Sequence, residues 1–291
     1  MTDNSMKSIY QKRTRIGDNI LKALIYLAAG LAIALLVGIM GYVFVRGLPQ
    51  VSWQFLSTVQ SSLKGTFGIL GNIINTIYII VITLIIAAPI GIGSAIYLNE
   101  YAKPGKLVRT IEFTTEILSG IPSIIFGLFG MVFFGMTLKL GYSVLTGSFT
   151  LTLMVLPLIT RNTQEALKTV PDSYRSGALG IGATKWYMIR TILLPSAAPG
   201  ILTGVILSIG RIVGESAALL FTAGSGFQLP KNLFGKLFES SGTLTIQLYL
   251  SMQKAKYDQA FGIAVVLLII VLGINLLTRF LTSRFDVTKL K

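Results

Sequence analysis

Arg211 and Glu215 place two opposite charges inside a run of apolar and small residues, GRIVGESAAL at 210–219. A guanidinium offers a planar fork of donors that fits the oxygens of a phosphate or a carboxylate, and it stays charged at any physiological pH. A carboxylate four residues later on a helix can form an ion pair with it on the same face. The two residues therefore predict either an anion site or a self-neutralising contact that only joins helices.

Small and polar residues continue this helix face at spacings of three and four. They are Gly200, Gly204, Ser208, Arg211, Glu215, Ala218 and Thr222. Such a stripe fits close packing of two helices, with Gly210 and Gly214 as a second edge on another face. Because charges lie at its middle, the stripe also fits the lining of a polar path through a membrane. Arg211, Glu215 and Ser208 are the candidate residues of that path.

The composition excludes much enzyme chemistry. Histidine and cysteine are both absent, which removes imidazole bases, thiolate nucleophiles and the commonest zinc ligands. An intramembrane hydrolase would then need a Ser–Lys dyad or paired aspartates, and the predicted spans contain neither Lys nor Asp. We predict no catalytic residue, no metal site and no cofactor bound by this chain.

The apolar runs predict an integral membrane protein, since 53% of the 291 residues are hydrophobic and only 12% are charged. A bilayer core of about 30 Å needs roughly 20 helical residues. The predicted fold is an all-α bundle of six transmembrane helices in a single domain. The predicted spans are about 24–45, 76–98, 117–138, 143–160, 199–221 and 260–281.

Arg211 is expected near the middle of the fifth span, since it lies ~18 Å from Pro199 at ~1.5 Å per helical residue. An arginine at this depth costs about 2.5–3.5 kcal/mol on insertion scales, so it must face protein, water or a counter-ion. Pro122 and Pro157 also fall within predicted spans, where they either shape a helix or act as hinges.

The basic residues predict the orientation. With both termini cytoplasmic, 17 Lys and Arg fall on inside segments and 7 on outside segments. This asymmetry agrees with the positive-inside rule. The first span is expected to be a retained anchor, because no small-x-small cleavage site follows it.

The inside segment 165–198 predicts an amphipathic hairpin. Pro171 suits the first turn of a helix, Gly182 suits its end, and a second helix is expected from Thr184 until Pro195 stops it. Such a hairpin either lies on lipid or docks to a protein partner.

The hairpin carries a spaced motif. Ser176-Gly177-Ala178 is followed after three residues by Gly182 and after nine more by Ile192-Leu193-Leu194-Pro195. This resembles the Glu-Ala-Ala, Gly and Ile-x-Leu-Pro pattern of permeases from binding-protein-dependent ABC importers, with Ser176 and Gly177 replacing Glu and Ala. The resemblance implies a type I permease fold and a coupling helix that docks on a cytoplasmic ATPase. The coupling residues are then Ser176, Gly177, Ala178, Gly182, Ile192, Leu194 and Pro195.

Longer segments are similar to the PstA-type permease family of bacterial phosphate importers. They are 177–224, NEYAKPGK at 99–106, GIPSIIFGL at 120–128 and TLTIQLY at 243–249. The resemblance implies ATP-driven import of phosphate by alternating access across the bacterial inner membrane. It implies Arg211 as a transport residue and a basic position at Arg161, which suits an anchor as well as a role at the exit.

The resemblance also implies partners. They are a homologous second permease (PstC-like), an ATPase dimer (PstB-like) that uses ATP and Mg, and an external phosphate-binding protein (PstS-like). The chain itself lacks GxxxxGK[ST], so another chain must bind the nucleotide. Two alternatives stay open: a permease for another oxyanion such as molybdate or sulfate, and a secondary transporter that uses Glu215 as a proton carrier.

Overall fold

A computed structural model describes residues 16–61, 65–230 and 232–284 of the chain. By its internal contacts the chain divides into two units, Met1–Arg46 and Gly47–Lys291, and the single domain stays a prediction. The first unit holds nearly all of α1 (Ile16–Gly47), an apolar helix long enough to cross a bilayer, which covers the predicted first span. Several basic residues behind the predicted orientation, at 1–15, 64, 231 and 285–291, lie outside the described residues.

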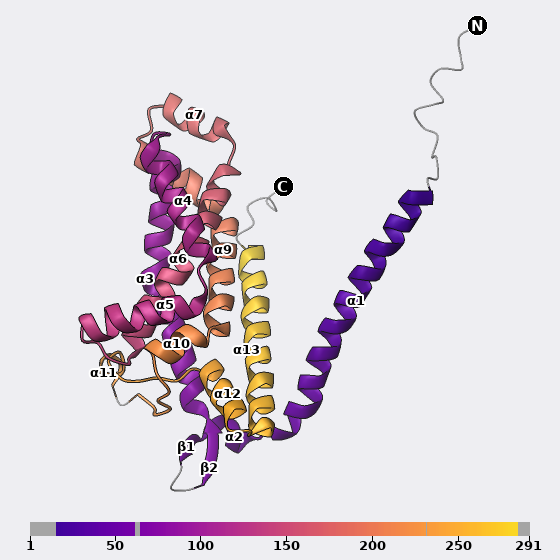
Figure 1. The fold of residues 1–291 in the computed structure, drawn as a ribbon. Helices are drawn as coiled ribbons and strands as arrows, with labels where there is room; N and C mark the ends of the chain where they lie inside the picture. Colours follow the sequence, from indigo (N-terminus) through magenta and orange to yellow (C-terminus); the bar gives the residue numbers. More distant parts are fainter. Residues whose placement is uncertain (1–15, 62–64, 231, 285–291) are drawn as a thin grey trace. The chain divides into compact units, whose positions relative to one another are not determined.

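The second unit is built on four long helices that run nearly side by side, α3 (Leu70–Ile96), α6 (Val144–Lys168), α9 (Leu194–Gly214) and α13 (Tyr257–Arg284) (Figure 1). The 3₁₀ turn η1 (Leu48–Gln50) and α2 (Trp53–Ser57) lead into a short antiparallel hairpin, β1 (Val59–Ser61) and β2 (Thr66–Ile69). Apart from that hairpin, the regular elements of the described residues are helical, as predicted.

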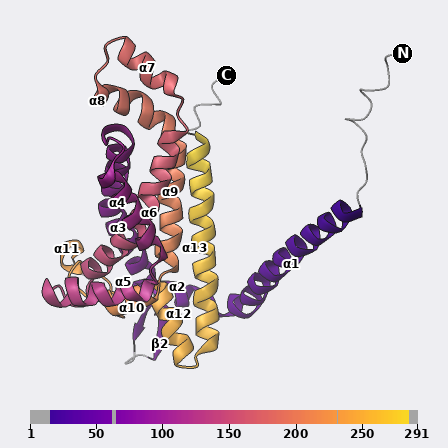
Figure 2. The same cartoon turned by 45° about the horizontal axis from the view of Figure 1, so that its top comes forward.

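Shorter helices complete the second unit. Between α3 and α6 lie the π-helical turn η2 (Tyr97–Tyr101), α4 (Lys106–Gly120), α5 (Ser123–Gly130) and the π-helical segment η3 (Met131–Thr137). Between α6 and α9 lie α7 (Asp172–Gly180), α8 (Lys185–Met188) and the π-helical turn η4 (Ile189–Leu193). After α9 follow α10 (Ala217–Thr222), α11 (Leu233–Lys236) and α12 (Leu244–Gln253). α5 and α10 cross the direction of the long helices in both ribbon views (Figures 1 and 2).

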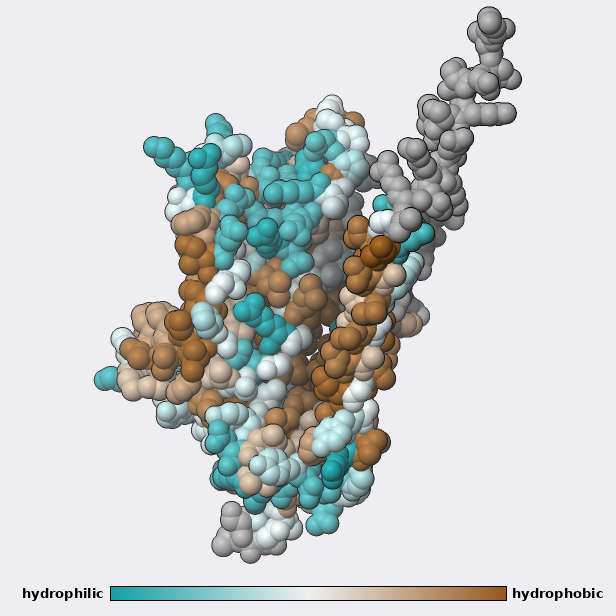
Figure 3. Space-filling view, turned by 45° about the vertical axis from the view of Figure 1, so that its right-hand side comes forward, coloured by the Kyte–Doolittle hydropathy of each residue, from teal (hydrophilic) through white to brown (hydrophobic). Residues whose placement is uncertain are grey.

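The surface of the second unit fits a membrane protein. On the face drawn in Figure 3, hydrophilic side chains gather toward the two ends, and apolar side chains lie between them beside a smaller hydrophilic group. Among the described residues, five helices are long and apolar enough to cross a membrane, and a bent helix pair makes a sixth crossing if it counts as one span.

α6 is the central helix of the second unit. It begins at Val144, capped by the Ser143 side chain, and continues past the predicted end at 160 to Lys168. Of its most apolar stretch, 67% is buried, against 28–33% for α3, α9 and α13, although its hydropathy is the lowest of these helices. The Thr and Ser residues that make it polar face other helices, where small hydroxyl side chains allow close packing.

The predicted span at 117–138 is not a straight helix. α4 starts at Lys106, and the chain bends by 102° between α4 and α5. Pro122 lacks an N–H for the helix and forces the residue before it out of the α conformation, and Ile121 is accordingly extended, with ψ of 130°. The proline therefore sets the shape of this segment, whereas α6 continues through Pro157.

The predicted helix stop at Pro195 is wrong. One helical run extends from Lys185 to Gly214 through α8, η4 and α9. The wider turn η4 ends two residues before Pro195, and π-helical turns of this kind can absorb the hydrogen bond that a proline removes.

The predicted continuous span at 199–221 is also wrong, because α9 ends at Gly214 and α10 begins at Ala217. Glu215 is extended, with ψ of 127°. Gly214 has a weak helix propensity, and the carbonyl of Glu215 finds a partner outside the helix in the Thr245 hydroxyl, at 2.8 Å. We call residues Glu215–Ser216 the helix break.

The segment between α10 and α12 is tied to α3 by three buried side chains. Asn72 donates to the carbonyl of Gly242 at 2.9 Å, and Asn75 donates to that of Gly226 at 3.0 Å. The hydroxyl of Thr76 accepts from the N–H of Leu244 at 3.0 Å. Backbone at membrane depth needs such partners when it is not helical.

Candidate functional site

Arg211 and Glu215 do not form the predicted ion pair in the described part of the structure. Arg211 lies half-buried in the last turn of α9, where the carbonyl end of the helix favours a positive charge. The Glu215 carboxylate turns to the next helix, and its Oε1 accepts a hydrogen bond from the N–H of Ala218 at 3.0 Å. The prediction failed because it assumed a continuous helix. The carbonyl end of α9 favours the charge of Arg211, whereas the first turn of α10 donates to Glu215.

The guanidinium of Arg211 is consequently available. Within residues 16–61, 65–230 and 232–284, no hydrogen bond or ion pair of the Arg211 side chain is present. A half-buried cation without a carboxylate can receive the oxygens of an anion through its fork of donors.

The small-residue stripe of α9 is a packing edge below Arg211. A Cβ placed on Gly200 would lie 2.5 Å from the Cβ of Ala166, and one on Gly204 would lie 2.6 Å from the Cβ of Asn162, both on α6. Ser208 is fully buried and donates to the carbonyl of Gly204 at 2.9 Å. From Gly200 to Ser208 the stripe therefore packs helices, and the Ser208 hydroxyl does not face an open path in this conformation.

Two interrupted helices meet at the centre of the second unit. α5 packs on α10, and the backbone approach is so close that a Cβ on Gly127 would lie 2.8 Å from the Cα of Ala218. Thus the helix that follows the bend and the helix that follows the helix break pack directly on each other. In membrane transporters, helices interrupted at bilayer depth mark binding sites, since the half-helix ends supply partial charges there.

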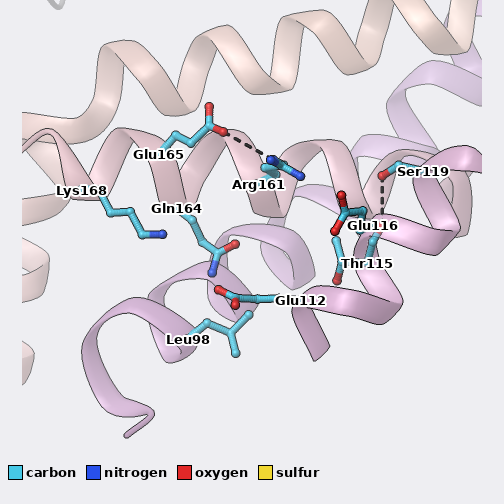
Figure 4. Close-up of a pocket in the computed structure, with 9 residues that line it drawn as sticks. All are labelled: Leu98, Glu112, Thr115, Glu116, Ser119, Arg161, Gln164, Glu165 and Lys168. Atoms are coloured by element: carbon cyan, nitrogen blue, oxygen red, sulfur yellow. Dashed lines mark hydrogen bonds and ion pairs between the residues drawn. The ribbon is translucent and has the colours of Figure 1, made fainter. Parts of the chain in front are cut away.

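Arg161 lies elsewhere, in an open pocket of about 280 Å³ between α4 and α6 (Figure 4). Its guanidinium forms an ion pair with Glu165 at 3.4 Å, and both side chains are 64% exposed. Glu112 and Glu116 of α4 line the same pocket. Three carboxylates around one arginine and Lys168 give a mixed surface rather than a cradle for an anion.

The predicted hairpin is present at the end of the second unit near the start of α9 (Figure 2). α7 begins after Pro171, which precedes the first turn instead of lying in it, and Gly182 follows with a φ of +82°. This left-handed conformation favours glycine at the end of a helix. We call α7, α8 and the turn between them the coupling hairpin.

The motif residues divide between the inside and the surface of the hairpin. Ala178 and Leu193 are buried, whereas Ser176 and Gly177 are exposed, and nothing lies near a Cβ added to Gly177. Ile192 and Leu194 are half-buried, and Pro195 is exposed. Large apolar side chains are also exposed here, namely Tyr174, Leu179, Ile181, Trp186 and Tyr187. An exposed apolar surface of this kind is typical of a docking site.

Sequence reasoning missed the best-bonded charged group of this region. Arg175 donates to the Oε1 of Glu100 from Nη2 at 3.0 Å and from Nε at 3.3 Å. The side chain of Glu100 is only 5% exposed. Because the two residues lie 75 positions apart, no local pattern could pair them. The only signal was an acidic residue directly after an apolar span.

Comparisons with known proteins give a consistent assignment. Residues 87–288 match the family model described as "Binding-protein-dependent transport system inner membrane component". The chain is similar to the "Probable ABC transporter permease protein YqgI" of Bacillus subtilis (strain 168), with 35% identity over 282 residues, 92% of this chain and 95% of the relative. It is also similar to the "Phosphate transport system permease protein PstA" of Mycobacterium leprae (strain TN), with 32% identity over 285 residues, 94% of this chain and 91% of the relative.

Among solved structures, a chain of a bacterial alginate ABC transporter in complex with an alginate-bound periplasmic protein superimposes with a TM-score of 0.65. The match covers 91% of this chain and 96% of that one, at 19% identity. At this identity the likeness concerns the fold alone, which is that of the type I importer permeases, as predicted.

Proposed function

Because this chain belongs to the family of binding-protein-dependent transport system inner membrane components, we propose that it carries inorganic phosphate into the cytoplasm. As a member of that family it is a multi-pass inner-membrane permease subunit of an ABC importer, without catalysis of its own. The choice of phosphate is supported by the names of relatives such as the Mycobacterium leprae protein. It is also supported by the chemistry of Arg211.

The available guanidinium at the helix break is the observation that carries the proposal. The Arg211 side chain has no hydrogen-bond partner in the described structure. An oxyanion can therefore accept two hydrogen bonds from it without displacing another group. The backbone N–H of Ala218 is occupied by Glu215, which keeps the start of α10 from holding the anion tightly. A carrier needs this balance, because its site must release as well as bind.

Other charged residues are assigned supporting roles. Arg161 is surrounded by Glu112, Glu116 and Glu165, which repel an anion, and we propose that it anchors the inner end of α6. The buried Ser208 positions α9 against α6 and does not contact phosphate in this conformation.

The proposed complex contains four kinds of chain. We propose a homologous second permease, an ATPase dimer that binds ATP and Mg beneath the coupling hairpin, and an external phosphate-binding protein. The exposed apolar residues of the coupling hairpin, such as Ile181 at 86% exposure, suit burial against the ATPase. Closure of the ATPase would then drive the spans between inward-open and outward-open states.

Uptake of radiolabelled phosphate into vesicles that contain the purified complex tests this function. We expect saturable uptake that needs ATP and the binding protein and persists in excess sulfate or molybdate. Inhibition by molybdate or sulfate at phosphate-like concentrations would assign the chain to another oxyanion. Uptake that continues without ATP, and collapses with the proton gradient, would instead identify a secondary transporter and refute the proposal.

A further inference from the structure

The end of α3 contacts both helices of the coupling hairpin. Glu100 in η2 receives two hydrogen bonds from Arg175 of α7, at 3.0 and 3.3 Å. The neighbouring Tyr101 ring lies under the ammonium of Lys185 in α8, which is 4.8 Å from the ring centre. An ion pair and a cation–π contact thus join one short turn to the two halves of the hairpin.

Arg175 also fixes the hairpin to the end of α6. Its Nη2 donates to the carbonyl of Leu167 at 2.9 Å, and its Nη1 donates to the carbonyl of Val170 at 2.9 Å. A third acceptor of the same guanidinium, the Asp172 carboxylate at 3.0 Å, is 98% exposed. The buried Glu100 is therefore the acceptor that connects this arginine to α3.

The burial of Glu100 makes its ion pair with Arg175 depend on the position of the hairpin. A carboxylate that is 5% exposed has lost almost all its water, so it requires its charged partner. Any shift of the hairpin relative to η2 would leave Glu100 buried without that partner. We therefore expect α3 to move together with the hairpin, because separating the two would break the ion pair between Glu100 and Arg175.

The far end of α3 reaches the helix break through two further hydrogen bonds. Thr76 accepts from the N–H of Leu244, and the next residue, Thr245, donates to the carbonyl of Glu215. Along its length α3 also packs closely on α6, where a Cβ on Gly91 would lie 2.7 Å from Ile159. Direct contacts therefore continue from the hairpin, along α3, to the helix break that follows the last turn of α9.

We propose that Glu100 is a positioning residue for coupling, which makes α3 the element that carries movement of the coupling hairpin to the helix break. The residue contacts neither nucleotide nor phosphate; it acts by holding Arg175 to α3. The proposal rests on the proposed function, because phosphate uptake is its readout, but it does not require that Arg211 itself contacts the anion.

The test compares two carboxylates that share one arginine. Glu100→Gln keeps the shape of the side chain and leaves the bonds from Arg175 to Leu167 and Val170, so the hairpin stays on α6. Asp172→Asn removes the exposed acceptor and is the matched control. In vesicles with the assembled complex, we measure phosphate transported per ATP hydrolysed.

We expect Glu100→Gln to lower the phosphate transported per ATP by about tenfold, within the usual range of coupling between sites. ATP hydrolysis should continue, and Asp172→Asn should behave like the wild type. A normal ratio in Glu100→Gln, with wild-type uptake intact, would overturn the inference. Absence of ATP-driven uptake in the wild type would instead refute the proposed function.

A covalent link between η2 and α8 distinguishes an effect of Glu100→Gln on coupling from an effect on folding. The chain contains no cysteine, so Tyr101→Cys and Lys185→Cys introduce its only thiols. A short bismaleimide between these thiols should restore the phosphate transported per ATP hydrolysed by Glu100→Gln. The same result is expected if that variant assembles poorly without the link. Restored assembly with an unrestored ratio would contradict a role of α3 in coupling.

Discussion

The coupling hairpin and the end of α9 each contain an arginine, and the two arginines differ in the number of their hydrogen-bond partners. Arg175 at the hairpin makes five hydrogen bonds, to Glu100, Asp172 and two backbone carbonyls. Arg211 at the break has no such partner among the described residues and depends on the carbonyl end of α9. All five donors of the first guanidinium are used in holding the fold together, whereas the second is free to bind the ligand that we propose. Hydrogen-bond partners are therefore the criterion by which we assign Arg175 to the fold and propose Arg211 for transport.

The largest expected effect is on stability, at the hairpin. Arg175→Ala leaves Glu100 buried without a counter-charge and removes the donors of two carbonyls, so we expect a loss of about 3 kcal/mol in unfolding free energy. Denaturant unfolding of the purified complex measures this loss. A loss no greater than that of Asp172→Ala would remove the contrast between the two regions.

The second effect is on transport, at the break. We expect Arg211→Gln to lower phosphate uptake by ~10- to 100-fold, since hydrogen bonds to charged groups contribute about 1.5–3 kcal/mol. Arg211→Lys should retain part of the uptake, because it keeps the charge but loses the fork. Stability should change little in both variants. Normal uptake in both would show that Arg211 only joins helices.

A third test locates the boundary between the packing edge of α9 and the region of Arg211. Gly204→Ala places a Cβ 2.6 Å from that of Asn162, and we expect it to destabilise the α6–α9 contact by about 1–2 kcal/mol. Gly210→Ala is the matched control, since no atom lies within 4 Å of its added Cβ. Thermal unfolding of the two variants distinguishes them. Equal destabilisation would place the packing edge on both faces.

The smallest effect is expected for the exposed pair in the pocket between α4 and α6. Arg161→Gln removes an ion pair in which both side chains are 64% exposed, and such pairs contribute about 0–1 kcal/mol. We expect neither stability nor phosphate uptake to change appreciably. A strong fall of uptake in this variant would move the anion path toward the pocket.

Local patterns were sufficient for much of the fold. Apolar runs located the long helices, and Gly182 was expected at the end of the first hairpin helix; it lies just after α7 and has a positive φ. Pro122 was recognised as a source of a bend, although its 102° angle was not. The predicted span at 143–160 is shorter and more polar than the others, and in the structure this polarity accompanies burial in α6.

The remaining features depend on contacts between distant segments. The helix break at Glu215 is accommodated by Thr245, thirty residues later, and periodicity within one span gives no sign of it. For the same reason the stripe of α9 was treated as one continuous surface, whereas its small residues from Gly200 to Ser208 face α6 and Arg211 lies beyond that contact. The predicted helix end at Pro195 was wrong because a π-helical turn can accommodate a proline inside a helix.

The hydroxyl-rich surface of α6 has a consequence for the assembly of the protein in the membrane. The most apolar stretch of α6 is less hydrophobic than those of α3 and α13, so α6 is the least able of the three to move alone from the translocation channel into lipid. α3 precedes it in the chain and packs closely along it through Gly91. We therefore expect α6 to stay beside the translocation channel until it packs on α3. The two helices would then enter the bilayer as a pair.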